Sequence, residues 1–96
     1  MTDKTLTIRC ADVTDAGALV RLAALDSSSP PTGDALIAEV GHEVWAAVEI
    51  DSGTAIADPF RPSAELVDLL RLRAGLTRGA KRAERRSLAR LLPRAA

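Results

Sequence analysis

Four groups of side chains in the sequence have the chemistry of catalysts or ligands: a histidine, a cysteine, two glutamates and a run of serines. His42 and Cys10 are the only residues of their type. No partner stands at the spacing of a metal site, of a Cys–His pair, or of a G-x-S-x-G motif around Ser27–Ser29. We therefore predict a solvated turn histidine, a small core cysteine and a serine loop. Glu39 and Glu49 fall on the polar face of two adjacent predicted strands, where facing carboxylates could exchange a proton. A solvent-facing sheet surface is the simpler interpretation, so the sequence predicts no catalytic residue and no metal ligand.

Trp45 and Ile37 are the sheet residues that favour a binding surface. By strand alternation both point away from the face that carries Val44 and Val48. If that side of the sheet is uncovered, the two side chains form an apolar patch that favours a protein partner. If the helix predicted after Ser63 covers them, they belong to the core. The sequence is compatible with both interpretations.

Acidic and basic residues occupy different parts of the chain. Residues 1–70 hold twelve Asp and Glu against four Lys and Arg, whereas residues 71–96 hold nine Lys and Arg against one acid. Formal charges of −8 and +8 therefore cancel in the neutral total. This division predicts either an anionic partner or a clamp of the basic segment on its own acidic body.

The basic segment has three interpretations. In the first it is a solvated, partly disordered C-terminus. In the second, residues 78–94 dock on anionic lipid or nucleic acid. In the third, they bind a protein partner, which includes the acidic body of a second copy. The absence of aromatic residues from this segment weakens the case for single-stranded nucleic acid. The predicted contact residues are Ile37, Trp45, Arg82, Arg85, Arg86 and Arg90.

Length and composition indicate one small domain. A chain of 96 residues has room for a thin core, here built from Ala, Leu, Val and Ile with one Trp and one Phe. The lone cysteine excludes an intrachain disulfide and fits a reducing compartment. The first residues lack the apolar region of a signal peptide, and no run approaches the ~20 apolar residues of a membrane span. We therefore expect a cytoplasmic protein, with the basic segment as a means of holding it at the inner face of the membrane.

The hydrophobic pattern predicts an α+β domain with a small, mostly antiparallel sheet. Alternation predicts strands over residues 6–10, 35–40, 43–50 and 54–57, with a tight Gly41–His42 turn in the central hairpin. Helical spacing predicts helices over residues 15–25 and 64–74, the second ending at Gly75. A further helix is predicted over residues 80–92, before Pro93. The order is β-α-β-β-β-α in residues 1–75, followed by a basic tail over residues 76–96, partly helical or disordered.

This order, together with three segments, resembles the N-terminal half of the GNAT N-acetyltransferase superfamily. The segment LTIRCADVTDAGALVRLAAL is similar to the family's first strand and helix, and ALIAEVGHEVWAAVEI resembles its hairpin. IADPFRPSAELVDLL resembles the stretch in which the fourth strand meets the cofactor-binding helix. The resemblance covers roughly residues 5 to 74 and implies half of a GNAT fold.

The same resemblance draws attention to the loop that would hold acetyl-coenzyme A. The family's R-x-x-G-x-G/A pattern has a counterpart at Arg61, but Pro62–Leu66 contains no glycine, and Glu65 places a negative charge where a pyrophosphate would lie. We therefore expect a non-catalytic interaction or regulatory module without a cofactor. It would associate with itself or bind a protein partner, and an exposed edge at the fourth strand would be one docking site. The alternatives are an acetyltransferase that a dimer partner completes, with Arg61 on acetyl-coenzyme A, and a peripheral membrane or nucleic-acid-associated protein.

Overall fold

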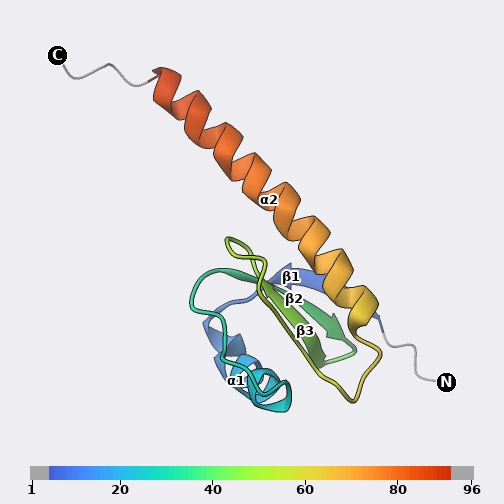
Figure 1. Cartoon of the computed structure of the whole chain (residues 1–96). Coiled ribbons are helices and arrows are strands. Elements are labelled where there is room, and N and C mark those ends of the chain that lie inside the picture. Colours follow the sequence, from blue (N-terminus) through green and yellow to red (C-terminus); the bar gives the residue numbers. More distant parts are fainter. Residues whose placement is uncertain (1–4, 92–96) are drawn as a thin grey trace.

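The computed structural model describes residues 5–91, which form an open four-stranded antiparallel sheet with a short helix on one face and a long helix on the other (Figure 1). The strands are β1 (Leu6–Cys10), β2 (Ala35–Val40), β3 (Glu43–Glu49) and β4 (Ala55–Ala57), in the spatial order β1-β2-β3-β4. A 3₁₀ turn, η1 (Val13–Asp15), leads into α1 (Ala16–Leu25), and α2 (Ala64–Leu91) follows β4. The predicted α+β class and the predicted order of strands and helices along residues 6–74 are confirmed.

The turns that join the strands use the residues that each conformation demands. Gly41 has φ +64° at the first central position of the β2–β3 hairpin, which suits glycine and matches the right-handed twist of the paired strands. Gly53 has φ +74° in the turn between β3 and β4. Neighbouring strands pair antiparallel throughout, and these two turns fix the registers of β3 on β2 and of β4 on β3.

Each face of the sheet carries its own hydrophobic cluster. α1 covers one face, where Leu22 and Ile37 are fully buried. The N-terminal half of α2 covers the other face, where Leu70 and Ala74 pack on small strand residues. Small strand side chains such as Ala38, Ala46 and Ala47 let both helices lie close to the sheet, which produces a thin three-layer body.

A β-bulge at Trp45 changes the faces that we predicted for β3. Glu39 pairs with Val44 while Ala38 pairs with Ala46, so Trp45 is an extra residue in the ladder. The predicted common face of Val44 and Val48 is therefore wrong, since Val44 packs in the α1 cluster and Val48 packs in the α2 cluster.

Helix α2 is one continuous element of 28 residues, about 42 Å long at 1.5 Å per residue. The prediction that it ends at Gly75 and that a separate helix begins at residue 80 is wrong. Gly75 does not adopt the positive φ of a helix-terminating glycine, and in the following turns a hydrogen bond from Arg78 and an ion pair of Lys81 hold the helix against the body. Beyond residue 78 the helix projects past the sheet, and the described part of the chain extends 61 Å in its longest direction (Figure 1). Residues 92–94, the end of the predicted anion-binding segment, lie outside the described residues.

Candidate interaction surface

The side chains with the chemistry of nucleophiles or ligands lie apart from one another. His42 is exposed at the tip of the hairpin, and Ser27–Ser29 form a loop after α1. Cys10 is exposed at the end of β1, which corrects the prediction of a small core residue. Within residues 5–91 no three His, Cys, Asp or Glu side chains gather closely enough to hold a metal ion.

Glu39 and Glu49 do not face each other, because the register pairs Glu39 with Val44 and Glu49 with Ala35. Glu39 instead accepts a hydrogen bond from Arg9 at 3.3 Å. The same Arg9 makes a two-pronged contact with Asp15, with both N–O distances at 2.8 Å. This contact, with a hydrogen bond from the Asp12 N–H, lowers the pKa of Asp15 to about 2. The polar side chains around β1 are thus structural.

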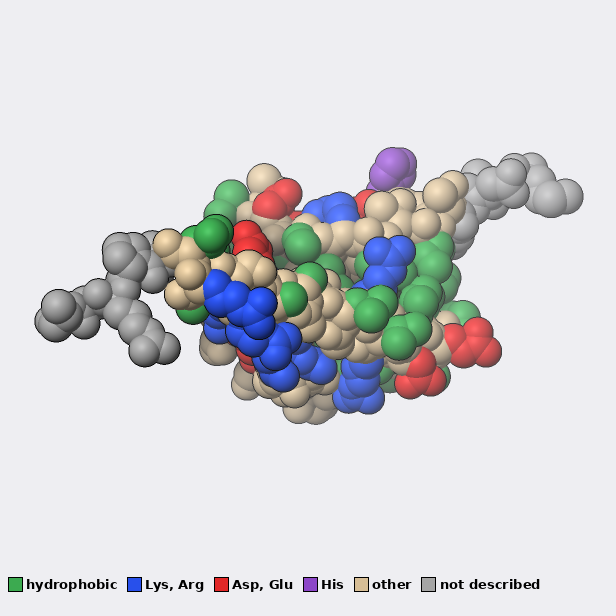
Figure 2. Space-filling view, turned by 90° about the horizontal axis from the view of Figure 1, so that it is seen from above, with side chains coloured by type: hydrophobic (Ala, Val, Ile, Leu, Met, Phe, Trp, Pro, Cys, Tyr) green, Lys and Arg blue, Asp and Glu red, His purple; other side chains and the backbone are tan. Residues whose placement is uncertain are grey.

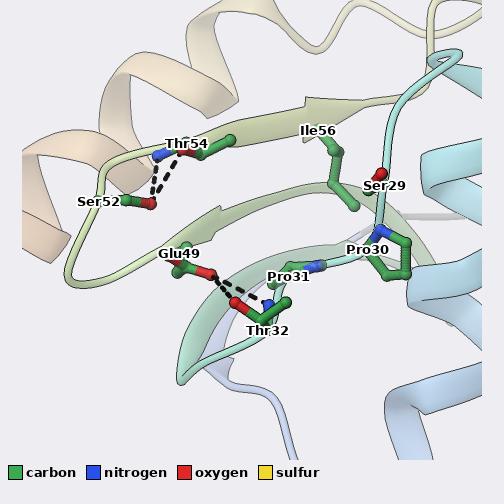
Figure 3. Close-up of a pocket in the computed structure, with 8 residues that line it drawn as sticks. All are labelled: Ser29, Pro30, Pro31, Thr32, Glu49, Ser52, Thr54 and Ile56. Atoms are coloured by element: carbon green, nitrogen blue, oxygen red, sulfur yellow. Dashed lines mark hydrogen bonds between the residues drawn. The ribbon is translucent and has the colours of Figure 1, made fainter.

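Glu49 lines a cavity of about 240 Å³ between the 29–32 loop and the β3–β4 turn (Figure 3). Its carboxylate accepts hydrogen bonds from the Thr32 N–H and hydroxyl at 3.1 and 3.3 Å and from the Gly33 N–H at 3.3 Å. Hydrogen bonds from Ser52 and from these groups lower the pKa of Glu49. These hydrogen bonds favour the charged form of Glu49, which makes it a weaker proton acceptor, and they join β3 to the loop before β2.

Arg61, the residue that would contact acetyl-coenzyme A in the acetyltransferase alternative, is already paired. Its guanidinium donates to both Glu43 carboxylate oxygens at 3.2 and 3.3 Å and lies 5.2 Å from the centre of the Trp45 ring. These contacts neutralise its charge and use its flat face. The bulge that displaces Trp45 is what brings the ring to this guanidinium.

The corner before α2 is built by side chains rather than by glycines. The Ser63 hydroxyl donates to the Asp58 carbonyl oxygen at 3.0 Å, and the Asp58 carboxylate accepts from the Phe60 N–H at 2.9 Å. An open hollow lies outside this corner, lined by Pro59, Arg61, Pro62, Ser63, Ala64 and Glu65. A phosphate approaching the start of α2 would meet Pro62, which has no N–H, and the Glu65 carboxylate.

The predicted sheet residues differ in accessibility. Ile37 has no exposed surface because α1 covers it, so it belongs to the core and is not part of an exposed patch. Neither sequence interpretation anticipated this, because the helix after Ser63 covers the opposite face. Trp45 is half-buried beside Arg61. At the β4 edge the Asp26 carboxylate accepts from the Ala57 N–H at 3.1 Å and occupies part of the edge that we expected to be free.

Three cations on the body side of α2 bind the chain's own loops. Arg78 donates to the Ile50 carbonyl oxygen at 2.6 Å, and Arg71 donates to the Gly53 carbonyl oxygen at 3.1 Å. Lys81 lies 3.6 Å from the Asp34 carboxylate. Part of the basic segment therefore clamps the body, as one of the two sequence interpretations expected, and of these three contacts only that of Lys81 is with an acidic side chain.

The four arginines predicted as contact residues lie beyond this clamp. We use the name arm for residues 79–91 of α2, which hold Arg82, Arg85, Arg86 and Arg90. Within the described part of the chain these four form no ion pair or hydrogen bond, and Figure 2 shows cations gathered over this end of the helix. Arg82 and Arg85 border an open hollow with Arg78, Lys81 and Asp51.

Sequence reasoning missed a second feature of α2, a row of leucines on the face that points away from the sheet. Leu72 and Leu76 are 64% and 66% exposed, and Leu69 is 37% exposed. We call these three residues the leucine stripe. Their spacing of three and four residues is visible in the sequence, but it is hard to separate from the sheet-facing row because Leu69 and Leu70 lie next to each other in the chain. Figure 2 shows hydrophobic side chains over this half of the helix.

None of the helices within residues 5–91 has both the length and the apolar composition needed to cross a membrane. Comparison of the chain with protein-family models, with curated proteins and with solved structures gave no match.

Proposed function

We propose that this chain is a non-catalytic, GNAT-like interaction module whose binding element is helix α2. The observation that carries the proposal is the length of that helix: Leu70 and Ala74 anchor its first half, and the arm projects beyond it with four arginines that form no ion pair within residues 5–91. A helix of which only half is packed on its own domain presents a rigid surface to a protein partner or to a second copy.

The state of Arg61 supports a binding role over acetyl transfer. In the acetyltransferase alternative this cation would contact the cofactor, and here Glu43 and Trp45 already bind it. If the Arg61 guanidinium left Glu43 for a pyrophosphate, it would first lose this half-exposed ion pair, which contributes ~0.2–1 kcal/mol. That loss would reduce the net attraction of Arg61 for the cofactor. Pro62 and Glu65 would remain at the mouth of the loop.

The experiment is a calorimetric titration of the chain with acetyl-coenzyme A, repeated on Glu43→Gln, which frees Arg61. We expect no heat of binding with either protein and no change in melting temperature at millimolar ligand. Micromolar binding that tightens in Glu43→Gln and disappears in Arg61→Ala would refute the non-catalytic role and support the acetyltransferase alternative.

The arm also favours a second candidate, a peripheral contact with an anionic surface. Leu88 and Leu91 are 52% and 81% exposed and lie among the four arginines, a composition found in interfacial helices. This candidate predicts co-sedimentation with vesicles that contain phosphatidylglycerol but not with vesicles of phosphatidylcholine. Binding that persists after Arg82, Arg85, Arg86 and Arg90 are replaced by Gln would contradict it.

A further inference from the structure

The leucine stripe continues into the arm as a row of small residues. Leu69, Leu72, Leu76, Gly79 and Ala83 are separated by three, four, three and four residues, the spacing of the a and d positions of a coiled coil. The helix places this row on the side opposite Leu70 and Ala74, which contact the sheet. The row therefore faces away from the domain along most of α2.

We propose that a second copy of this chain packs antiparallel on this row, so that two α2 helices form the centre of a homodimer. This inference rests on the proposed function, because it takes α2 as the binding element and names its occupant. In the register that sets Leu76 against Gly79 of the partner subunit, Leu72 faces Ala83 of the partner subunit. Leu72 and Leu76 then each meet a small residue, which permits close approach of the helices there, and Leu69 lies opposite Arg86 of the partner subunit.

Charge selects the antiparallel direction. The outward face of α2 begins with Glu65 and Asp68 and ends with Arg86 and Arg90. In the register above, Glu65 lies opposite Arg90 of the partner subunit, so opposite charges meet at both ends. A parallel pair would place Arg86 and Arg90 against their own copies, and such like charges oppose association.

The same face fits a second copy better than it fits an anionic membrane. Glu65 and Asp68 border the stripe and would be repelled by anionic headgroups, whereas they match the partner subunit's arm. The two sheets do not interfere with this pairing, because each lies on the inner side of its own helix (Figure 1).

The first test measures mass by sedimentation equilibrium of the full chain, from about 1 to about 300 µM, the range that resolves a micromolar Kd. We expect a mass that rises from one chain of 10.1 kDa toward twice that value. Leu76→Glu should weaken association by on the order of 100-fold, since it places two carboxylates in the centre of the contact. Leu88→Glu is the matched control, because Leu88 is exposed on the same helix but lies outside the row, and its Kd should stay within about 3-fold of wild type.

The second test establishes direction by cysteine cross-linking in a Cys10→Ser background. Glu65→Cys and Arg90→Cys chains should form a mixed disulfide dimer when combined, and neither should cross-link efficiently alone. Self-cross-linking of both variants would overturn the antiparallel arrangement. Circular dichroism of each variant establishes that a loss of dimer is not a loss of fold.

Different results would refute the homodimer and the non-catalytic role. A chain that remains a monomer at all concentrations, or a Leu88→Glu variant that dissociates as readily as Leu76→Glu, overturns the homodimer. Neither result bears on acetyl-coenzyme A, and binding of that cofactor would refute the non-catalytic role whatever the oligomeric state.

Discussion

Replacement of Arg78 by Met should destabilise the fold, whereas replacement of Arg82 by Met should not. Both residues belong to the basic end of α2, and each substitution removes one positive charge. Only Arg78 reaches the body, where it donates to the Ile50 carbonyl oxygen at 2.6 Å in a partly buried setting. Arg82 is exposed and makes no hydrogen bond within residues 5–91.

The size of the difference follows from that one contact. A hydrogen bond from a charged donor contributes about 1.5–3 kcal/mol, and partial exposure reduces this to about 1–2 kcal/mol. Relief of repulsion among the neighbouring cations is similar in the two variants and cancels in the comparison. For a domain of this size, about 1–2 kcal/mol corresponds to a decrease in Tm of roughly 5–15 °C.

The assay is thermal unfolding by circular dichroism at a low protein concentration, so that self-association does not affect Tm. We expect Arg78→Met to lower Tm within the range above and Arg82→Met to change the free energy of unfolding by less than about 0.5 kcal/mol. Equal destabilisation by the two variants would refute the division of the basic residues into a clamp and an arm.

Further predictions concern the body of the domain. Asp15→Asn should lower the free energy of unfolding by about 1–2 kcal/mol at neutral pH, because the hydrogen bonds from Arg9 are weakened. Since folding lowers the pKa of Asp15 from 3.8 to about 2, this stabilisation is present above pH ~4 and is lost as the pH falls through about 2, so denaturant titrations of wild type and variant should converge there. Gly41→Ala should lower the free energy of unfolding by about 1–2 kcal/mol, because alanine is strained at φ +64°. Gly17→Ala should raise it by about 0.5–1 kcal/mol, because Gly17 lies within α1 and an added Cβ meets nothing within 4 Å. Urea unfolding of both variants measures these opposite changes. Ile37→Ala should cost about 2–4 kcal/mol in the same assay, and a neutral effect would contradict its place in the core.

The strands could be predicted because their alternation is regular and their turns contain glycine at positions of positive φ. The strands observed at Leu6–Cys10 and Ala35–Val40 have the predicted bounds. Trp45 shows where this reasoning fails. As one extra residue in β3, it moves the β3 side chains that precede it to the opposite face of the sheet, and no local sequence pattern marks a bulge. For the same reason the sequence assigned Val44 to the wrong cluster.

The length of α2 could not be predicted from local preferences alone. Gly75 and Gly79 each cost about 1 kcal/mol in a helix, which favours a break. Contacts distant in sequence oppose that cost, namely Arg78 with the Ile50 carbonyl oxygen and Lys81 with Asp34. The arm arginines were identified from composition, whereas the leucine stripe became evident once the sheet-facing side of the helix was fixed.

The most direct test of the outward face of α2 as the interaction surface is amide hydrogen exchange of the full chain at two concentrations, one below and one above the onset of association. We predict that amides of residues 76–90 exchange at least about 10-fold more slowly at the higher concentration, because association adds contacts to an arm whose four arginines form no ion pair or hydrogen bond within residues 5–91. Exchange in β1 and α1 should not change. Rates in α2 that do not depend on concentration, or new protection confined to β4, would contradict the account.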